Sequence, residues 1–286
     1  MTNKKIYFLG PKTSYTDVAK EKLKSQFNLV GYEDVEKPTI TAVASELSNL
    51  LNDESLAVLP IENSIEGIVK EAIDNISRIE DNQVKILGEC VIPINHCLIT
   101  YAEDLGNIKT VVSHPQAISQ CFDYIYQTFG ENVVYKSETS TANAIKNISP
   151  DDVTVCAIGS RYSAEYYNKP IKAENINDEK FNQTRFFLIG KMHMPKFDMD
   201  YKTSIVFSTE NKSGALCEIL QVLQKHDINM LHISSRPSKK ILGEYTFYID
   251  FEGKIFDEKV SKAMFEILQL VKTFKHLGTY PKSQEN

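Results

Sequence analysis

The hydrophobic pattern of this chain changes in kind at one point, and that change limits its fold more than any single motif. Up to residue 190, short apolar runs alternate with stretches that have apolar residues at helical spacing, as in the run Lys5–Leu9 and the segment Tyr15–Phe27 that follows it. Strands that alternate with helices predict an α/β domain with a largely parallel sheet. The strand-like stretch Val84–Thr100 is interrupted at Pro93, which predicts a strand that crosses between two lobes or turns a corner.

The segment Lys191–Tyr201 breaks this alternation, because it combines a proline with mixed charge and lacks a sustained period. We interpret it as a linker. Beyond it, alternating strand patterns and two helical stripes follow the order β-α-β-β-α-β in roughly eighty residues, the length of one split βαβ domain. The predicted domains therefore cover residues 1–192 and 202–281.

Composition and charge exclude several classes of function. The net charge of −6 and the lack of a basic stripe argue against nucleic acid as the main partner. The apolar runs fall short of the ~20 residues that a membrane helix needs, and the N-terminus lacks a signal-peptide pattern. We therefore expect no membrane association and a cytoplasmic location.

The five cysteines lack paired spacing, which suits a reducing compartment, and the six histidines have no metal-ligand spacing. A lone reactive cysteine is an alternative that this pattern leaves open.

Polar residues gather where predicted strands of the first domain end. Exposed backbone N–H groups at a helix start attract anions, although Ser, Thr and Asn also fill such positions simply as helix caps. Taken together, the junctions favour a small polyanionic ligand held by neutral donors and one arginine, Arg185. They comprise Gly10–Ser14, Glu62–Ser64, Ser113–Gln116, Ser140-Thr141, Gly159-Ser160 and Thr184-Arg185. Neither a phosphate loop nor a dinucleotide fingerprint nor a G-x-S-x-G elbow occurs, so we expect a site without a cofactor.

These motifs, in this order, resemble those of the prephenate dehydratase family. The matching segments of the first domain are Leu9-Gly10-Pro11 with Ser14-Tyr15-Thr16, Pro60–Gly67, Ser113-His114-Pro115-Gln116-Ala117, Ser140-Thr141-Ala142 and Asn182-Gln183-Thr184-Arg185-Phe186. The second domain resembles an ACT regulatory domain at Asn211–Leu216 and Ser235–Ser238. The resemblance departs at Thr13, where the family has glycine, and at Ser234, where it has glutamate. Thr13 predicts a different turn in the loop after Gly10-Pro11, and Ser234 affects the detail of effector binding.

The resemblance implies a fold, a reaction and a set of site residues. It implies an α/β catalytic domain with two lobes, like a periplasmic binding protein, followed by a ferredoxin-like (βαββαβ) ACT domain. It implies conversion of prephenate to phenylpyruvate with loss of CO2 and water, without a metal, and a homodimer or homotetramer inhibited by L-phenylalanine. We expect Thr184 to give a proton or hydrogen bond to the leaving hydroxyl and Arg185 to hold a carboxylate bidentately. The other expected catalytic residues are Asn63, Ser64 and Glu62, and the expected substrate-binding residues are Ser113, Gln116, Ser140, Thr141 and Phe186.

Glu62 is expected to be protonated or turned away, since a carboxylate beside a dianion is unfavourable. The turn before the first helix of the second domain can offer free N–H groups to the carboxylate of an amino acid. The expected phenylalanine-binding residues are Asn211, Gly214, Ala215, Leu216, Ser235, Arg236 and Pro237.

The sequence leaves three alternatives open. An arogenate dehydratase would act on the amino analogue of prephenate. A binding protein that senses amino acids without catalysis would not need Thr184 beside Arg185. A structural protein that assembles through its second domain would leave the polar junctions unexplained.

Overall fold

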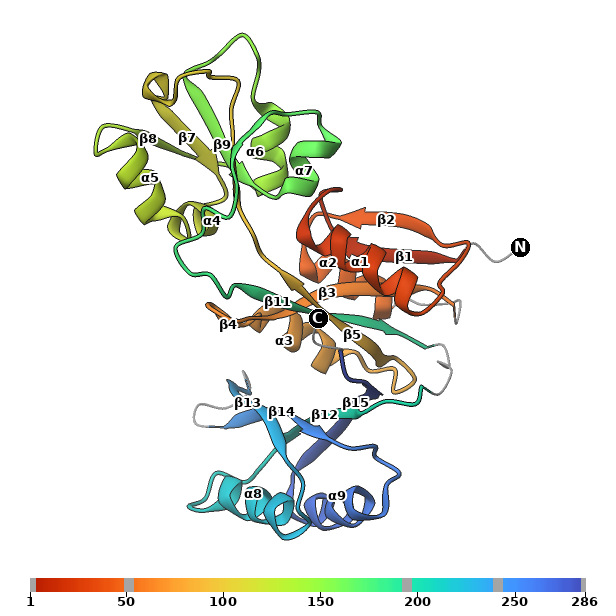
Figure 1. The fold of residues 1–286 in the computed structure, drawn as a ribbon. Coiled ribbons are helices and arrows are strands. Elements are labelled where there is room, and N and C mark those ends of the chain that lie inside the picture. The colour runs from red at the N-terminus through yellow and green to blue at the C-terminus, as the bar shows by residue number, and fades with distance from the viewer. Residues whose placement is uncertain (1–3, 49–53, 192–196, 239–243, 284–286) are drawn as a thin grey trace.

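The computed structural model describes residues 4–48, 54–191, 197–238 and 244–283. They form two α/β lobes and a C-terminal domain, stacked so that lobe I lies between the other two (Figure 1). Lobe I comprises β1 (Lys5–Leu9), α1 (Tyr15–Gln26), β2 (Glu33–Lys37), α2 (Ile40–Ser48), β3 (Leu56–Asn63), β4 (Gly67–Ile68), α3 (Lys70–Arg78), β5 (Lys85–Pro93) and the returning strand β11 (Gln183–Gly190).

The sheet of lobe I is mixed, with the strand order β2-β1-β3-β11-β5. Strands β1, β2 and β3 are parallel, whereas β11 runs antiparallel to both β3 and β5. The expectation of a largely parallel sheet was wrong for this part. The reason is that β11 enters lobe I from lobe II and therefore runs back along the strands that preceded it.

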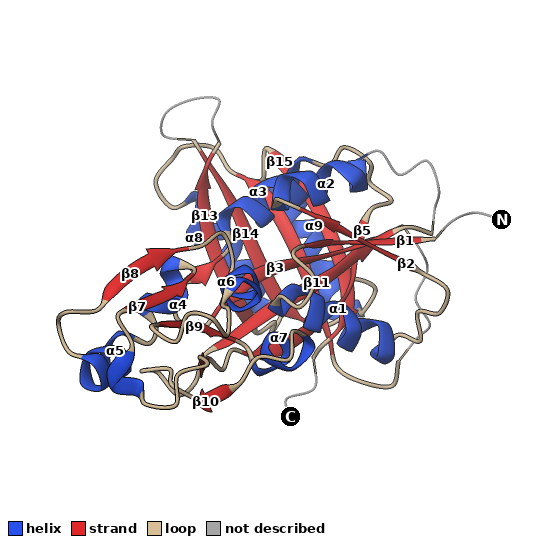
Figure 2. Cartoon of the chain, turned by 90° about the horizontal axis from the view of Figure 1, so that it is seen from above, coloured by secondary structure: helices blue, strands red, loops and turns tan. Residues whose placement is uncertain are grey.

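The two faces of this sheet have separate apolar cores, and β11 contributes alternately to each. Phe186 and Leu188 pack with α1, whereas Phe187 and Ile189 pack with α2 and α3 on the opposite face. Helix α1 accordingly lies on one side of the sheet and helices α2 and α3 on the other (Figure 2). Consecutive residues of β11 thus point to different neighbours, which decides the surroundings of each predicted site residue.

Lobe II is connected to lobe I by two crossings of the chain. One leads from β5 to β6 near Pro93, as the interrupted strand predicted, and the other leads from β10 back to β11. The sheet of lobe II has the order β10-β6-β9-β7-β8. Its elements are β6 (Cys97–Ile99), η1 (Leu105–Asn107), β7 (Thr110–Ser113), α4 (Pro115–Ser119), α5 (Phe122–Phe129), β8 (Val134–Ser137), α6 (Thr141–Asn147), β9 (Val155–Gly159), α7 (Arg161–Tyr166) and β10 (Ile171–Ala173).

The C-terminal domain has the predicted β-α-β-β-α-β order. The elements are β12 (Tyr201–Ser208), α8 (Ala215–Lys225), β13 (Met230–Pro237), β14 (Tyr245–Glu252), α9 (Glu258–Leu270) and β15 (Thr273–Pro281), and the strand order is β13-β14-β12-β15. Both helices pack on one face of this sheet. Of the predicted linker Lys191–Tyr201, residues 192–196 lie outside the described part of the chain.

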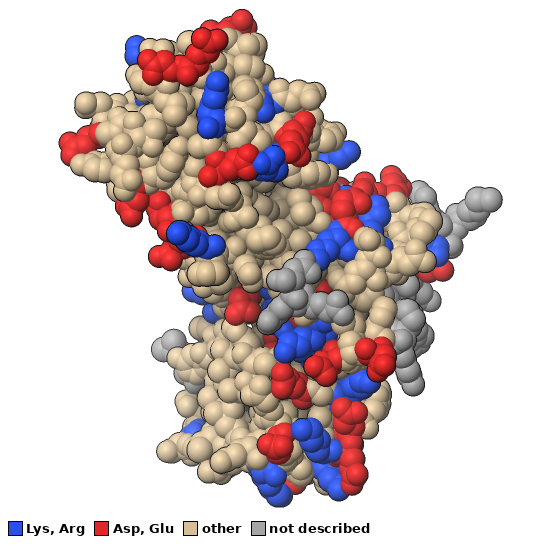
Figure 3. Space-filling view, viewed as in Figure 1, with Lys and Arg blue, Asp and Glu red and all other residues tan. Residues whose placement is uncertain are grey.

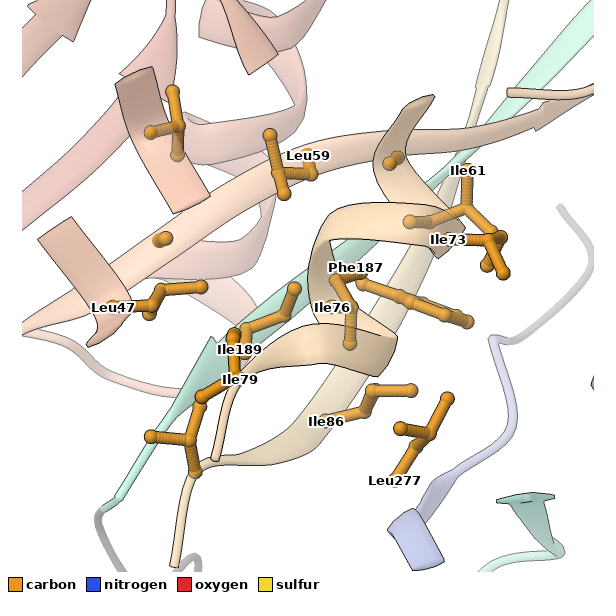
Figure 4. Packing of buried hydrophobic residues seen from close by; sticks show 14 of the residues in the cluster. Leu47, Leu59, Ile61, Ile73, Ile76, Ile79, Ile86, Phe187, Ile189 and Leu277 are labelled. Carbon is orange, nitrogen blue, oxygen red and sulfur yellow. The ribbon is translucent and has the colours of Figure 1, made fainter. Parts of the chain in front are cut away.

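The other face of the C-terminal sheet packs against lobe I. Leu277 of β15 joins the apolar cluster of lobe I that contains Ile86 and Phe187 (Figure 4). The backbone contact is so close that a Cβ on Gly278 would lie 2.3 Å from the carbonyl oxygen of Ile86. The ammonium of Lys275 also donates to the carbonyl oxygens of Ile76, Ser77 and Ile79 at the end of α3. The C-terminal domain is therefore docked directly on the lobe that carries β11.

Candidate active site

The predicted site is centred on Thr184, near the start of β11, just after the chain returns from lobe II. Thr184 is paired in the sheet with Asn63, the last residue of β3. The side-chain amide of Asn63 donates to the hydroxyl oxygen of Thr184 at 3.0 Å. Two segments that are 121 positions apart in the chain thus bring together the hydroxyl and the amide that the sequence predicted as catalytic.

The orientation of the Asn63 amide is fixed by its other hydrogen bonds. Its oxygen accepts from the backbone N–H groups of Ile65 and Glu66, each at 3.0 Å, so its nitrogen must face Thr184. A hydroxyl group has one proton to donate and two lone pairs that accept. Because Asn63 occupies a lone pair, the proton of Thr184 remains available to a bound ligand.

A hydrogen-bond network continues from this pair to lobe II. The Asn63 amide also donates to the side-chain oxygen of Asn182 at 2.7 Å, and the Asn182 amide donates to the side-chain oxygen of Gln120 at 2.9 Å. That oxygen lies 3.3 Å from Nε2 of His96. Burial lowers the pKa of His96 to about 4, so the imidazole is neutral at pH 7 and its Nε2–H donates to Gln120.

The sequence interpretation missed Gln120, His96 and the role of Asn182. Gln120 follows Gln116 by four residues, which is one helical turn, so a helix that begins at Pro115 would place both side chains on one face. That spacing was a signal that could have found it. No pattern in the sequence indicates that His96, on the crossing from β5 to β6, is buried beside Gln120.

The predicted residues of lobe II lie at strand ends and helix starts, and two of them have structural hydrogen bonds. Ser113 is fully buried, and its hydroxyl donates to the carbonyl of Ile158 at 2.6 Å, so it links β7 to β9. Ser140 caps α6 by accepting from the N–H of Asn143 at 3.0 Å. Thr141 begins α6 and Gln116 lies in the first turn of α4. Ser140 therefore acts as a helix cap, which is the alternative role that the sequence left open. This role does not exclude a contact between Ser140 and a ligand.

Arg185 lies on the opposite face of β11 from Thr184. Its guanidinium lies 2.7 Å from a carboxylate oxygen of Asp250 and 3.3 Å from one of Glu62. Burial acts to lower the pKa of Arg185, but the carboxylate of Asp250 and other neighbours more than offset this and raise it. The expected bidentate hold of Arg185 on a substrate carboxylate receives no support from this placement, because consecutive strand residues point to opposite faces.

Glu62 is turned away from Thr184 and is ionised. Its carboxylate lies 3.1 Å from Nδ1 of His232 on β13, and hydrogen bonding to His232 is the main cause that lowers the pKa of Glu62. Of the two expected states of Glu62, protonated or turned away, the second holds. A catalytic acid at this position receives no support, because a carboxyl group with a lowered pKa has no proton to give at neutral pH.

Two further predicted residues have structural surroundings. Phe186 is 2% exposed within the core between the lobe I sheet and α1, so its expected contact with substrate is not supported. The hydroxyl of Ser64 donates to the carbonyl of Phe181 at 2.9 Å and accepts from the N–H of Gln183 at 3.0 Å. Ser64 thus fixes the chain that leads into Thr184.

The loop after β1 contacts lobe II. Thr13 is fully buried with φ 73°, the left-handed conformation that glycine adopts readily, and the different turn expected at this departure stays a prediction. The hydroxyl of Ser163 on α7 donates to the carbonyl of Thr13 at 2.8 Å. The two lobes are therefore linked at this contact as well as by the two chain crossings.

Comparison with known proteins matches both domains of the chain to described families. The family model described as prephenate dehydratase matches residues 6–194, which is more than half of the chain. The chain belongs to the prephenate dehydratase family. The ACT domain model matches residues 203–268. The predicted family and the predicted fold are both confirmed.

Relatives and solved structures support the assignment over nearly the whole chain. A prephenate dehydratase from Methanocaldococcus jannaschii is 42% identical, and the match covers 98% of each chain. A crystal structure of the prephenate dehydratase from Arthrobacter aurescens in complex with L-Phe is similar with a TM-score of 0.84 and 27% identity, over 97% of this chain and 90% of that one. A structure described as GqqA, a quorum-quenching acylase, has a TM-score of 0.82 at 23% identity over 98% of each chain, and this likeness concerns the fold alone.

The predicted effector residues of the ACT domain lie on two different faces of its sheet. Gly214, with φ 83°, leads into α8 beside Asn211, and Ala215 and Leu216 begin that helix on the helical face. Ser235 and Pro237 are exposed on β13. Arg236 differs from them, because its side chain lies 3.9 Å from Asp74 of α3 and faces lobe I. The structure therefore does not bring Arg236 together with the turn before α8.

The described ranges contain no group of histidine, cysteine, aspartate or glutamate side chains that could hold a metal ion. Within those same ranges, no helix has the length and apolar character needed to cross a bilayer. Acidic and basic side chains are interspersed on the face of the molecule shown in Figure 3.

Proposed function

We propose that this protein converts prephenate to phenylpyruvate. The observation that carries the proposal is the Asn63–Thr184 hydrogen bond, which directs a lone pair of the threonine hydroxyl to the amide and leaves its proton for a ligand. In the reaction, the bond from the ring to its carboxylate breaks and CO2 leaves. The electron pair of that bond enters the ring, and the ring hydroxyl departs with a proton as water.

The roles of the residues follow from this balance. Thr184 hydrogen-bonds to the departing hydroxyl and assists its protonation, either directly or by relay through a water molecule. Asn63 holds Thr184 in place, and Asn182 with Gln120 holds Asn63. Hydroxyl and amide groups of lobe II, at Ser140, Thr141 and Gln116, bind the carboxylates between the lobes with the backbone N–H groups beside them. Aromatisation of the ring supplies much of the driving force, so orientation and one proton are the main contributions of the protein.

The test is phenylpyruvate formation by the purified protein, with Thr184→Ala and Thr184→Ser as a matched pair. We expect Thr184→Ala to lose at least about tenfold in kcat, in the range of acid catalysis, and Thr184→Ser to keep most of it. Near-normal turnover by Thr184→Ala with an intact fold would remove Thr184 from the mechanism. The same assay with arogenate, in which L-phenylalanine is the product, separates the two dehydratase activities. A protein that binds prephenate without turnover would be a sensor instead.

We also propose that L-phenylalanine inhibits the enzyme through the ACT domain. Support comes from the turn before α8, where Gly214 precedes the helix without a side-chain cap, and from the L-Phe complex of the similar Arthrobacter aurescens protein. We expect L-phenylalanine to raise the melting temperature and to lower turnover. Calorimetry that detects no binding at millimolar L-phenylalanine would contradict this regulation.

We also propose that the protein is a homodimer or homotetramer and that it is located in the cytoplasm. The edge strand β13 presents the partly exposed apolar side chains of Leu231 and Ile233, which a second copy of the chain could cover. Light scattering at micromolar concentration measures the oligomeric state, and a monomeric mass would contradict the proposal.

A further inference from the structure

The two residues of the proposed catalytic pair each have a charged neighbour in the chain. In the antiparallel register of β11 and β3, Thr184 lies opposite Asn63 and Arg185 lies opposite Glu62. Because the side chains of consecutive strand residues alternate, Thr184 faces one side of the sheet and Arg185 the other. The ring of Phe187 confirms the side, since it lies 5.1 Å from the Arg185 guanidinium and packs against the C-terminal domain.

Both charged neighbours are held by side chains of the ACT domain. Asp250 of β14 is fully buried and lies 2.7 Å from the guanidinium of Arg185. His232 of β13 lies 3.1 Å from the carboxylate of Glu62. The residue that follows Thr184 and the residue that precedes Asn63 are therefore both attached to the regulatory domain.

Within the ACT domain, Asp250 has a further hydrogen bond. The hydroxyl of Ser204 donates to the second carboxylate oxygen of Asp250 at 2.6 Å and lies 2.7 Å from the hydroxyl of Tyr280. A third interdomain pair joins Lys202 to the fully buried Glu89 at 2.7 Å. Separating Asp250 from Arg185 would leave two buried charges without a counter-charge, so we expect a displacement of β14 to displace Arg185 as well.

We propose that Asp250 and His232 are positioning residues for the dehydratase reaction, which act on Thr184 and Asn63 through Arg185 and Glu62. In this arrangement the ACT domain holds both strands that carry the catalytic pair, and a change in its position alters the alignment of the threonine hydroxyl. The inference rests on the proposed function for its kinetic readout, whereas its structural readout does not.

The same contacts argue against Arg185 as a ligand for the substrate. Three carboxylates, those of Glu62, Glu89 and Asp250, lie within 3.7 Å of its guanidinium. Their summed negative charge would repel a dianion that approached the same group. The cation is already neutralised by the protein, so its function is to join the two domains.

The experiment compares four variants of the full-length protein: Asp250→Asn, Arg185→Met, the double variant of both, and Lys275→Met. Lys275→Met is the control, because Lys275 also joins the ACT domain to lobe I but does so at α3. We expect Asp250→Asn to lower kcat at least tenfold with KM changed by less than threefold. We expect the double variant to lose no more than the worse single variant, since the two residues act as a pair. Lys275→Met should keep kcat within twofold.

Hydrogen exchange of the backbone supplies the readout that does not require activity. We expect Asp250→Asn to speed exchange in the segment 181–187 and Lys275→Met to leave that segment unchanged. Because a variant with a buried unpaired guanidinium can fail to fold, the less buried His232→Leu is measured in parallel and should also speed exchange there and lower kcat.

Three results would overturn the inference. A raised KM in Arg185→Met with normal kinetics in Asp250→Asn would make Arg185 a substrate ligand. Equal effects of Asp250→Asn and Lys275→Met would mean that these residues only support domain docking. Unchanged exchange in segment 181–187 of both Asp250→Asn and His232→Leu would also contradict it. A wild-type protein without dehydratase activity would reject the proposed function alone, because the exchange measurement would still decide the positioning role.

Discussion

The substitution Asn63→Asp tests the assignment of the Thr184 proton most directly. It keeps the shape of the side chain and the oxygen that accepts from the N–H groups of Ile65 and Glu66. It replaces the amide that now donates to Thr184 at 3.0 Å with a carboxylate oxygen. The threonine hydroxyl would then donate its proton to that oxygen instead of to the departing hydroxyl of the substrate.

The size of the effect follows from the strength of the new bond. A hydrogen bond to a charged group contributes about 1.5–3 kcal/mol, which must be lost before the proton can be used. At about 1.36 kcal/mol per factor of ten, kcat should fall roughly 10- to 150-fold. The loss should shrink as the pH falls towards the carboxyl pKa of about 4, because the protonated carboxyl group no longer takes the proton of Thr184.

The assay is steady-state phenylpyruvate formation between pH 4 and 8, with Asn107→Asp on the surface of lobe II as the control for an added charge. Only Asn63→Asp should show the rise towards low pH relative to wild type. A variant with wild-type kcat at pH 8 would refute the hydrogen-bond arrangement of Asn63 and Thr184.

Three other perturbations have defined outcomes. Burial lowers the pKa of His96 to about 4, below its unfolded value near 6.5. The contribution of the neutral imidazole to the free energy of unfolding is therefore complete above pH 6.5, and about 3 kcal/mol of it is lost as the pH falls to 4. Urea unfolding should show this loss in wild type and a smaller one in His96→Leu, and identical pH slopes of the two proteins would contradict it. Gly278→Ala forces a Cβ to within 2.3 Å of the Ile86 carbonyl, so the free energy of unfolding should fall by about 1–3 kcal/mol, and an unchanged urea midpoint would disprove that close approach. Ser163→Ala removes the donor to the Thr13 carbonyl, so the free energy of unfolding should fall by about 1 kcal/mol. KM should change while kcat stays within threefold, and a change in kcat alone would be inconsistent with a contact between the lobes.

The predicted site residues differ in how far the sequence could locate them. The pairing of Thr184 with Asn63 depends on β11 lying beside β3; the family motifs named both residues as members of the site but did not indicate that they are paired. The expectation that Thr184 and Arg185 act on one ligand ignored a rule available from the sequence, since consecutive residues of a strand face opposite ways. Asp250 and His232 could not have been found, because no local pattern tells which lobe a second domain will contact.

The helix boundaries likewise differ in how well the sequence could locate them. A serine before an apolar stripe is a local signal for a helix start, so the sequence predicts Ser14 as the cap of the first helix, and Ser14 does cap α1. The sequence pattern predicts the second helix around Ser45–Leu51, whereas α2 already begins at Ile40; residues 49–51 lie outside the described part of the chain. Thr39 provides the missed start signal, since its hydroxyl accepts from the N–H of Ala42 at 3.0 Å. The apolar spacing from Ile118 to Ile125 predicts a single helix after Ser113-His114-Pro115, but the structure has two, α4 and α5. Gln120 lies between them, and its side chain takes part in the network to Asn182.

The contact between Ser163 and Thr13 has a consequence for how substrate enters. It lies between the lobes but on neither chain crossing, so separating the lobes on that side must break it. A net contribution of about 0.5–1.5 kcal/mol for this one bond favours the joined form over the separated form by a factor of about 2 to 13, relative to the same chain without the bond. Removing the Ser163 hydroxyl should therefore increase the share of molecules whose lobes are apart, and with it the access of substrate to the space between them.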